Sequence, residues 1–136
     1  MAINSISVRL GFEPQALSRL SALLYREDLS PESILVSLEA DGYLAHIIVS
    51  DSEKLVTLLT SHHFSHEARP VLAAAIPDQP GGLHVILKIL DRAAIRVNRV
   101  YPTLSQFGRG DFLILDVDDI DQARELLKEN WIHLAE

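Results

Sequence analysis

The stretch Pro77-Asp78-Gln79-Pro80-Gly81-Gly82-Leu83 lies between two regular segments of different periodicity. The apolar run 71–76 before it is typical of a strand, whereas residues 83–95 repeat apolar side chains at helical spacing. The glycines permit backbone angles that other residues resist, and Pro80 suits the first turn of a helix. The stretch therefore predicts a tight strand-to-helix turn, with the Asp78 carboxylate as the N-cap.

The same turn is also a candidate ligand site. Free N–H groups at the start of a helix attract carboxylates and other anions. An ordinary capped turn explains the same residues, so on this stretch alone both interpretations stay open.

On both sides of this turn, the predicted elements follow the same order, β-α-β-β-α-β, once in each half of the chain. Alternating or continuous apolar runs predict strands at residues 3–10, 33–39, 43–49, 62–69 (a short strand and connector), 71–76, 95–104, 112–117 and 131–134. Helices are predicted to begin at Pro14, after the capping residues 50–52, at Leu83 and at 118–121. Hairpin turns are predicted at 41–42 and, more loosely, at 105–110.

The two halves can be superimposed by sequence. The equivalences are Pro14, Leu17, Leu20 and Leu24 with Pro80, Leu83, Ile86 and Leu90, each 66 positions later (80 − 14). After the first hairpin the offset is 68, because Leu58 and Leu59 match Leu126 and Leu127 (126 − 58). The second hairpin absorbs the two extra residues, where an insertion costs little.

This internal repeat predicts an α+β fold of two tandem ferredoxin-like βαββαβ repeats. Each repeat should form an antiparallel four-stranded sheet with both helices on one face. Because such a small unit buries little of its sheet alone, we expect the halves to pack together and to form a homodimer.

The amino-acid composition argues against several classes of binding partner and site. The 136 residues carry a formal net charge of −7 and no segregated basic face, which argues against nucleic acid. The absence of cysteine excludes disulfides, thiolate metal sites and cysteine nucleophiles, and suits a reducing compartment. No signal peptide or membrane-spanning run can be recognised, so we expect a cytoplasmic protein with no membrane partner.

The second half resembles an ACT domain. The resemblance rests on three stretches: Ile76 to Leu83, the positions Ile89, Leu90, Ile95 and Tyr101, and the helix 117–127. In ACT domains the turn typically reads Asn or Asp, any residue, Pro, Gly, a small residue, Leu. The resemblance implies two domains, residues 1–69 with a degenerate turn and residues 70–136 with an intact one.

The first half departs from the pattern at its turn. Phe12 stands where Asn or Asp is expected, and Gln15 stands where Gly is expected. Its residues 13–23 are similar to the small regulatory subunits of acetohydroxyacid synthase. Over nearly the whole chain, the likeness is to stand-alone tandem ACT proteins of bacteria.

What the ACT resemblance implies is binding of an amino acid between two ACT units. The implied ligand-binding residues are Asp78, Gln79, Pro80, Gly81, Gly82, Leu83, Arg96, Asn98 and Tyr101. Asp78 would hold the ammonium group, and the backbone of Gly81, Gly82 and Leu83 would hold the carboxylate. Arg96 stands where serine-binding members often carry Asn, which leaves the ligand's identity open.

Other polar clusters favour structural roles. His62, His63 and His66, with Glu67 nearby, have a spacing that could bind zinc, but a helix end with cationic histidines is the stronger interpretation. Aspartates 118, 119 and 121 fit a helix N-terminus better than a cation loop.

Three further side chains, outside these clusters, have roles that their positions predict. His84 is expected to face solvent rather than ligand. Phe64 and Trp131 occupy similar places in the two repeats and are expected in the core.

The sequence indicates no catalytic residue, metal or cofactor, because no nucleophile is paired with a base. Two functions remain. The first is a non-catalytic regulatory sensor that binds an amino acid at the second turn. The alternative is a regulatory subunit that binds an enzyme of amino-acid metabolism and needs no ligand of its own.

Overall fold

The computed structural model describes residues 3–77, 79–104 and 111–135. Residues 4–69 form one compact unit, and the other described residues form a second. These are called the first and second unit below. No helix in the described ranges is long and apolar enough to cross a membrane.

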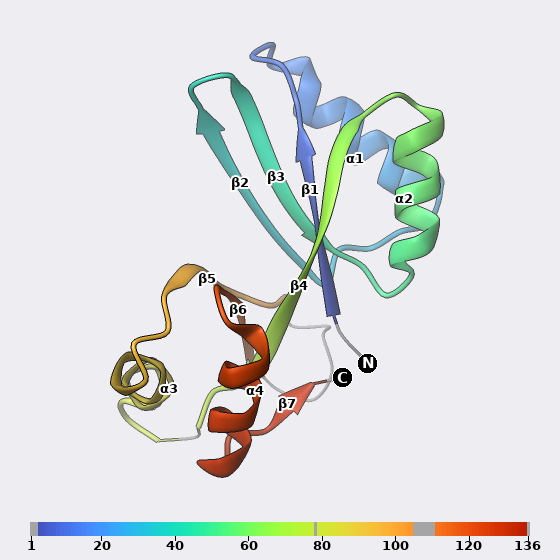
Figure 1. Ribbon diagram of the computed structural model, residues 1–136. Coiled ribbons are helices and arrows are strands. Elements are labelled where there is room, and N and C mark those ends of the chain that lie inside the picture. Colours follow the sequence, from blue (N-terminus) through green and yellow to red (C-terminus); the bar gives the residue numbers. More distant parts are fainter. Residues whose placement is uncertain (1–2, 78, 105–110, 136) are drawn as a thin grey trace. The chain divides into compact units, whose positions relative to one another are not determined.

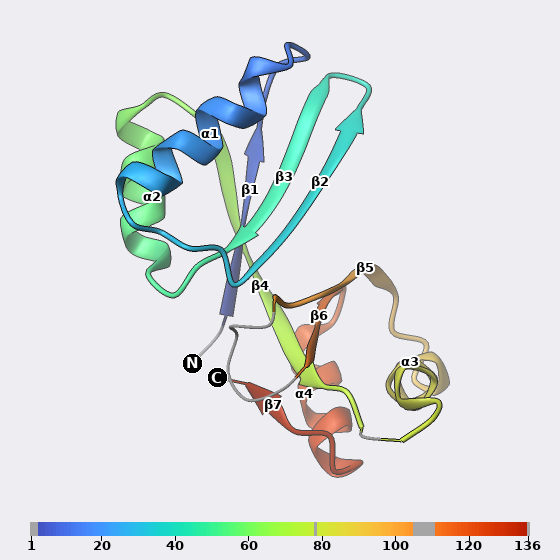
Figure 2. The same ribbon diagram turned by 180° about the vertical axis from the view of Figure 1, so that it is seen from behind.

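The first unit has the predicted βαββαβ order (Figure 1). Its elements are β1 (Ile3–Arg9), α1 (Gln15–Arg26), β2 (Ser33–Glu39), β3 (Gly42–Ile48), α2 (Ser52–Ser61) and the first part of β4 (Ser65–Ala75). The strand order is β2-β3-β1-β4, and the view from behind shows both helices on the same face of this sheet (Figure 2).

The second unit repeats the arrangement. After the last part of β4 come α3 (Gly82–Arg92), β5 (Val97–Pro102), β6 (Phe112–Val117), α4 (Ile120–Glu129) and β7 (Leu134–Ala135). The strands run in the order β7-β4-β6-β5, which is the order of the first unit with each element replaced by its repeat. The predicted α+β class with two ferredoxin-like repeats is confirmed.

Strand β4 serves both units, which the sequence did not predict. Two separate strands, 62–69 and 71–76, were expected, but a single 11-residue strand runs from Ser65 to Ala75. Pro70 lies inside it and is exposed. Proline removes one backbone N–H and restricts φ, but an extended backbone accommodates it at an exposed position, so it does not interrupt the strand.

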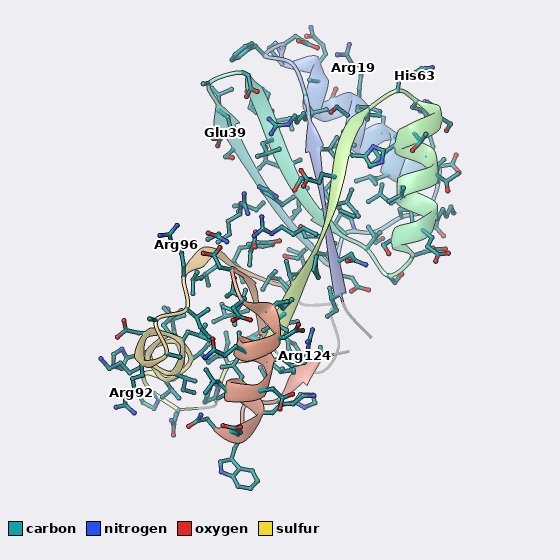
Figure 3. All side chains as sticks on the ribbon, in the orientation of Figure 1. Arg19, Glu39, His63, Arg92, Arg96 and Arg124 are labelled. Atoms are coloured by element: carbon teal, nitrogen blue, oxygen red, sulfur yellow. The ribbon has the colours of Figure 1, made fainter. Side chains whose placement is uncertain are left out.

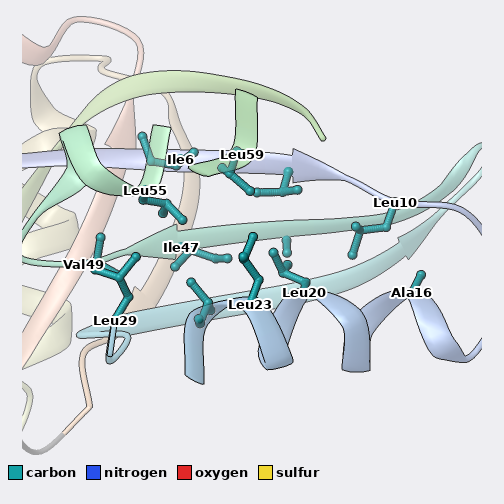
Figure 4. Close-up of a cluster of buried hydrophobic side chains, with 13 residues drawn as sticks. Ile6, Leu10, Ala16, Leu20, Leu23, Leu29, Ile47, Val49, Leu55 and Leu59 are labelled. Atoms are coloured by element: carbon teal, nitrogen blue, oxygen red, sulfur yellow. The ribbon is translucent and has the colours of Figure 1, made fainter. Parts of the chain in front are cut away.

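A cluster of apolar side chains forms the core of the first unit (Figure 4). Ile6 and Val8 of β1 alternate toward the helices beside Ala45 and Ile47 of β3, because successive strand residues point to opposite faces. The helices contribute residues at 3.6-residue spacing, namely Ala16, Leu20, Leu23, Leu24, Leu55 and Leu59. The second unit packs the equivalent positions, among them Ile86, Leu90, Ala123 and Leu127.

The repeat is also visible in the backbone. The described non-glycine residues with positive φ are Asp28, His63, Ala94 and Trp131. They form two equivalent pairs, 28 with 94 and 63 with 131, at the offsets 66 and 68. Each follows a helix, and the next residue donates its N–H to a carbonyl five residues earlier in all four cases.

This alignment corrects the predicted role of Trp131. Its equivalent is His63, and its side chain is 94% exposed, so it is not a core residue. The equivalent of Phe64 is Ile132, and these two side chains do pack against the cores. The error was one residue of register. The last strand, predicted at 131–134, is β7 at Leu134–Ala135.

Candidate ligand site

The candidate turn joins the end of β4 at Ala75 to the start of α3 at Gly82. Gln79 and Pro80 are exposed, and Asp78 lies outside the described residues. The N-cap is Gly81, which offers no side-chain cap, so the prediction of Asp78 as N-cap and of Pro80 inside the first helical turn is wrong. The helix begins later because Gly81 adopts the left-handed conformation, with φ +85°.

The two glycines serve different purposes. At Gly81 a Cβ atom would meet nothing within 4 Å, so the left-handed φ is what requires glycine there. At Gly82 a Cβ atom would lie 2.6 Å from the carbonyl oxygen of Pro77, so glycine allows a close backbone approach. The space beside Gly81 is open, whereas the space beside Gly82 is filled by the protein's own backbone.

Backbone donors at this helix start are only partly used. The Gly82 N–H donates to the Gln79 carbonyl at 3.2 Å, so this predicted ligand donor is already satisfied. The amides of Leu83 and His84 belong to the first turn, where a helix provides no acceptor of its own. The side chains of Leu83 and His84 are both exposed.

The N-terminus of α3 resembles that of α1, whose first turn also has no acidic residue and no side-chain cap, and it differs from the N-termini of α2 and α4. The N-termini of α2 and α4 are capped by Asp51 and Asp119, which accept from the N–H groups of Lys54 and Gln122 at 3.1 and 3.2 Å. The first turn of α3 has no acidic residue. The positive end of the α3 dipole therefore has no carboxylate in that turn.

The equivalent turn in the first unit is occupied by its own side chains. The Glu13 carboxylate accepts from Arg19 at 2.7 Å and folds back against the Cα of Gly11. The residues equivalent to Glu13 and Arg19 in the second unit are Gln79 and Val85, which cannot form this ion pair. The two turns therefore differ in their side-chain contacts as well as in sequence.

Arg96 and Asn98 gather around a different residue, Asp118. Asn98 donates an amide hydrogen to the Asp118 carboxylate at 2.9 Å, and the Arg96 guanidinium lies 3.9 Å from its other oxygen. The Asp118 N–H also donates to the Arg96 carbonyl at 3.1 Å. Both members of the ion pair are more than half exposed, so it contributes little stability.

A bulge explains the orientation of the β5 side chains. The register shifts between Val97 and Arg99, so Asn98 is the extra residue of the strand. Beyond the bulge, Arg99 is paired with Asp116 and Tyr101 with Ile114 across the ladder. Tyr101 is buried and is therefore not an exposed ligand contact.

The predicted site residues are thus not brought together within one chain. Gly82 begins α3, whereas Arg96 follows the C-terminal end of this helix. Figure 3 shows the Arg96 side chain where the chain enters β5. An 11-residue helix is about 16 Å long at roughly 1.5 Å per residue. Gln79 to Leu83 form one locus, Arg96 and Asn98 form a second, and Tyr101 is buried in the sheet opposite Ile114.

The remaining polar clusters have structural partners. Asp118, Asp119 and Asp121 contact Asn98, the Gln122 N–H and Arg124, respectively. His66 is hydrogen bonded to the Phe64 carbonyl at 2.9 Å. In the part of the chain that the structure describes, no group of three His, Cys, Asp or Glu side chains could hold a metal ion.

Sequence reasoning missed two polar pairs on the sheets. In the first unit, Ser7 of β1 and the buried His46 of β3 are hydrogen bonded at 2.9 Å. In the second unit, the Arg99 guanidinium is paired with the buried Asp116 carboxylate. Each pair joins neighbouring strands, a contact that strand alternation alone cannot reveal before the register is known.

Comparison with known proteins finds similarity in structure but not in sequence. No protein-family model matches the chain, and no curated protein does. The protein BT0572 of Bacteroides thetaiotaomicron matches with a TM-score of 0.89 at 22% identity, covering 99% of this chain and 92% of that one.

Regulatory subunits of aspartate kinase are also similar. Those of Thermus flavus and Thermus thermophilus match with TM-scores of 0.63 at 8% and 10% identity, each covering 94% of this chain and 90% of that one. At such low identities the likeness concerns the fold. The chain therefore has an ACT-like fold of two consecutive βαββαβ units, similar over nearly its whole length to regulatory subunits.

Proposed function

We propose that this chain is a non-catalytic regulatory protein that binds an amino acid at the turn 78–83 of its second ACT repeat. The observation that carries the proposal is the start of α3, where an open left-handed Gly81 precedes a helix turn without acidic residues. The ACT-like fold and the regulatory subunits that share it support the same role. The proposal divides the chain into repeats 1–69 and 70–136.

In this proposal the ligand's carboxylate lies at the N-terminus of α3. The Leu83 and His84 amides donate to it, and the helix dipole adds favourable charge. Asp78 takes the ammonium group, as the ACT resemblance implies. Arg96 and Asn98 are a helix length away from their own turn, so any contribution from them comes from a second copy of the chain.

Isothermal titration calorimetry with individual amino acids tests the proposal. Leu83→Asp introduces a carboxylate into the first helical turn, where it stabilises the helix but repels the carboxylate of the bound amino acid. Leu83→Asn has nearly the same shape without the charge. We expect an amino acid that binds the wild type and Leu83→Asn, and that loses at least tenfold in affinity to Leu83→Asp.

The control against misfolding is built into this pair, because the aspartate should raise the melting temperature slightly rather than lower it. Equal affinities of Leu83→Asp and wild type would reject the turn as the binding site. The absence of heat with every amino acid at millimolar concentration would reject the function.

A second candidate is a regulatory subunit that recognises an enzyme without a ligand. The observation that favours it is Trp131, which is 94% exposed in a left-handed backbone conformation. Tryptophan is enriched among residues that dominate protein interfaces. Affinity capture from the native cell, with and without amino acids and with Trp131→Ala as the comparison, separates the two functions.

A further inference from the structure

A cleft of about 450 Å³ lies in the first unit, between the N-terminal half of α2 and the strands β1 and β4. This volume is in the range of small-molecule sites. The lining residues all fall within residues 4–69, so the first unit forms the cleft by itself. The apolar part of the lining is formed by Ile6, Val56 and Ala68, and the polar part includes Asn4, Ser52 and Glu53.

The polar part of this lining is open to a ligand. Among the described residues, no hydrogen bond or ion pair is formed by the side chains of Asn4, Ser52 and Glu53. Glu53 is the only charged residue in the described lining. Its neighbour Lys54 donates to the Glu27 carbonyl at 2.8 Å and does not line the cleft. The negative charge of the Glu53 carboxylate is therefore not matched by a cation in the cleft.

The second unit shows which group such a carboxylate can hold. At the 68-residue offset, Asp121 is equivalent to Glu53, and Arg124 is equivalent to Val56. The Arg124 guanidinium, on α4 in Figure 3, donates to the Asp121 carboxylate at 3.0 Å. The Arg124 side chain is only 29% exposed, so most of its stem is packed against the unit. The second unit thus supplies a cation on an apolar stem, and the first unit supplies only the carboxylate.

The substitution of valine for arginine leaves the first unit without this cation and with apolar surface beside the carboxylate. Ile6, at the apolar part of the lining, is itself 1% exposed. A ligand that replaces the arginine must carry a guanidinium or ammonium group on a short apolar stem. The Asn4 carbonyl oxygen and the Ser52 hydroxyl can accept further N–H groups of such a ligand.

An anion does not suit this cleft. The Glu53 carboxylate repels it, and the N-terminus of α2 is already capped by Asp51, which accepts from the Lys54 N–H at 3.1 Å. The charge of the lining therefore selects for cations.

We propose that the cleft of the first unit binds a small organic cation, with a guanidinium or primary ammonium group on a short apolar stem. The cationic group lies against the Glu53 carboxylate, and the stem lies against Val56 and Ala68. This site is separate from the turn 78–83, and it does not rest on the function proposed above.

NMR titration of the isotope-labelled protein with n-butylguanidinium and with n-butylammonium tests the proposal. Neither probe carries a carboxylate, so the result does not depend on amino-acid binding at the turn 78–83. We expect saturable shifts of the amides at 4–6, 52–57 and 68, and the probe that binds more tightly identifies the cationic group. The uncharged n-butanol has the same stem and should not saturate the site.

Two substitutions remove the binding by different means. Glu53→Gln keeps the size of the side chain without its charge, so the affinity for the cation should fall roughly fivefold or more. Glu67→Gln is the matched control, because it changes the net charge equally, next to Ala68 but outside the lining. Val56→Arg copies the second unit and should abolish binding, whereas Val56→Ala at the same position should still bind.

Absence of saturation by both cations at tens of millimolar would overturn the proposal. So would equal binding of n-butanol, equal affinities of Glu53→Gln and Glu67→Gln, or a folded Val56→Arg protein that binds like the wild type. The dispersion of the NMR spectrum shows whether each variant is folded. If Val56→Arg does not fold, the comparison of Glu53→Gln with Glu67→Gln decides.

Discussion

At the scale of single residues, the adjacent glycines of the turn should respond differently to the same substitutions. At Gly81 the restriction is the left-handed φ, so Gly81→Ala should cost about 1–2 kcal/mol and Gly81→Asn less, because asparagine tolerates that conformation. At Gly82 the restriction is the Pro77 carbonyl, so Ala and Asn should both cost about 1–3 kcal/mol. Urea unfolding of the four variants measures this. A well-tolerated Gly82→Asn would contradict the close approach.

The partly buried carboxyl of Glu32 should make the stability of the fold depend on pH. Burial raises the pKa of its carboxyl above the ordinary value of 4.5. The folded protein then binds this proton more tightly than the unfolded chain, so stability falls as pH rises from 4.5 through the raised pKa. Glu32→Gln should therefore be more stable than wild type at neutral pH.

The advantage of Glu32→Gln should disappear at about pH 4, where the carboxyl of the wild type is protonated in the folded state. Denaturant unfolding of both proteins at the two pH values checks the sign. A stability difference that does not change with pH would show that the carboxyl's charge is not the cause.

At the scale of elements, the helix caps are the most quantitative feature. Asp51 and Asp119 occupy equivalent positions and accept the same kind of N–H bond, so Asp51→Ala and Asp119→Ala should each cost about 1 kcal/mol. Asp121→Ala is the control, because its side chain is 91% exposed and its loss should cost only a few tenths. Thermal unfolding that ranks Asp121 with the two caps would contradict the assignment.

Element order was largely predictable because each element carries its own periodic signal. Alternation located β2 at residues 33–39, and the 66- and 68-residue offsets located the four helices. The fusion of two predicted strands into β4 was not predictable, because a proline at an exposed strand position and a proline in a connector have the same sequence signal. Trp131 was misplaced for a related reason, since a one-residue register error reverses which side chain is buried.

At the scale of the whole molecule, the candidate site could be predicted only in part. The turn 77–83 was evident because glycine and proline report directly on backbone conformation. The second locus, Arg96 and Asn98, followed from the resemblance, and its separation from the turn depends on the length of α3 and on the bulge in β5. A contribution from a second copy of the chain cannot be derived from the periodicity of one chain.

The difference between the two turns predicts how many ligands each chain binds. The first turn carries the Glu13–Arg19 ion pair, while the N-cap of the second, among the described residues, is the open glycine Gly81, which has no side chain to cap the helix. If the turn 78–83 is the binding site, each chain holds one ligand. Removing the ion pair with Glu13→Gln should not create a second site, because the first turn still lacks the glycine at position 15.

Calorimetric titration of the wild-type protein with the amino acids, one at a time, shows whether one turn per chain binds an amino acid. We expect saturable binding of an amino acid at one molecule per chain, strongly weakened by Leu83→Asp. Binding of two molecules per chain, or no binding of any amino acid at millimolar concentration, would contradict it.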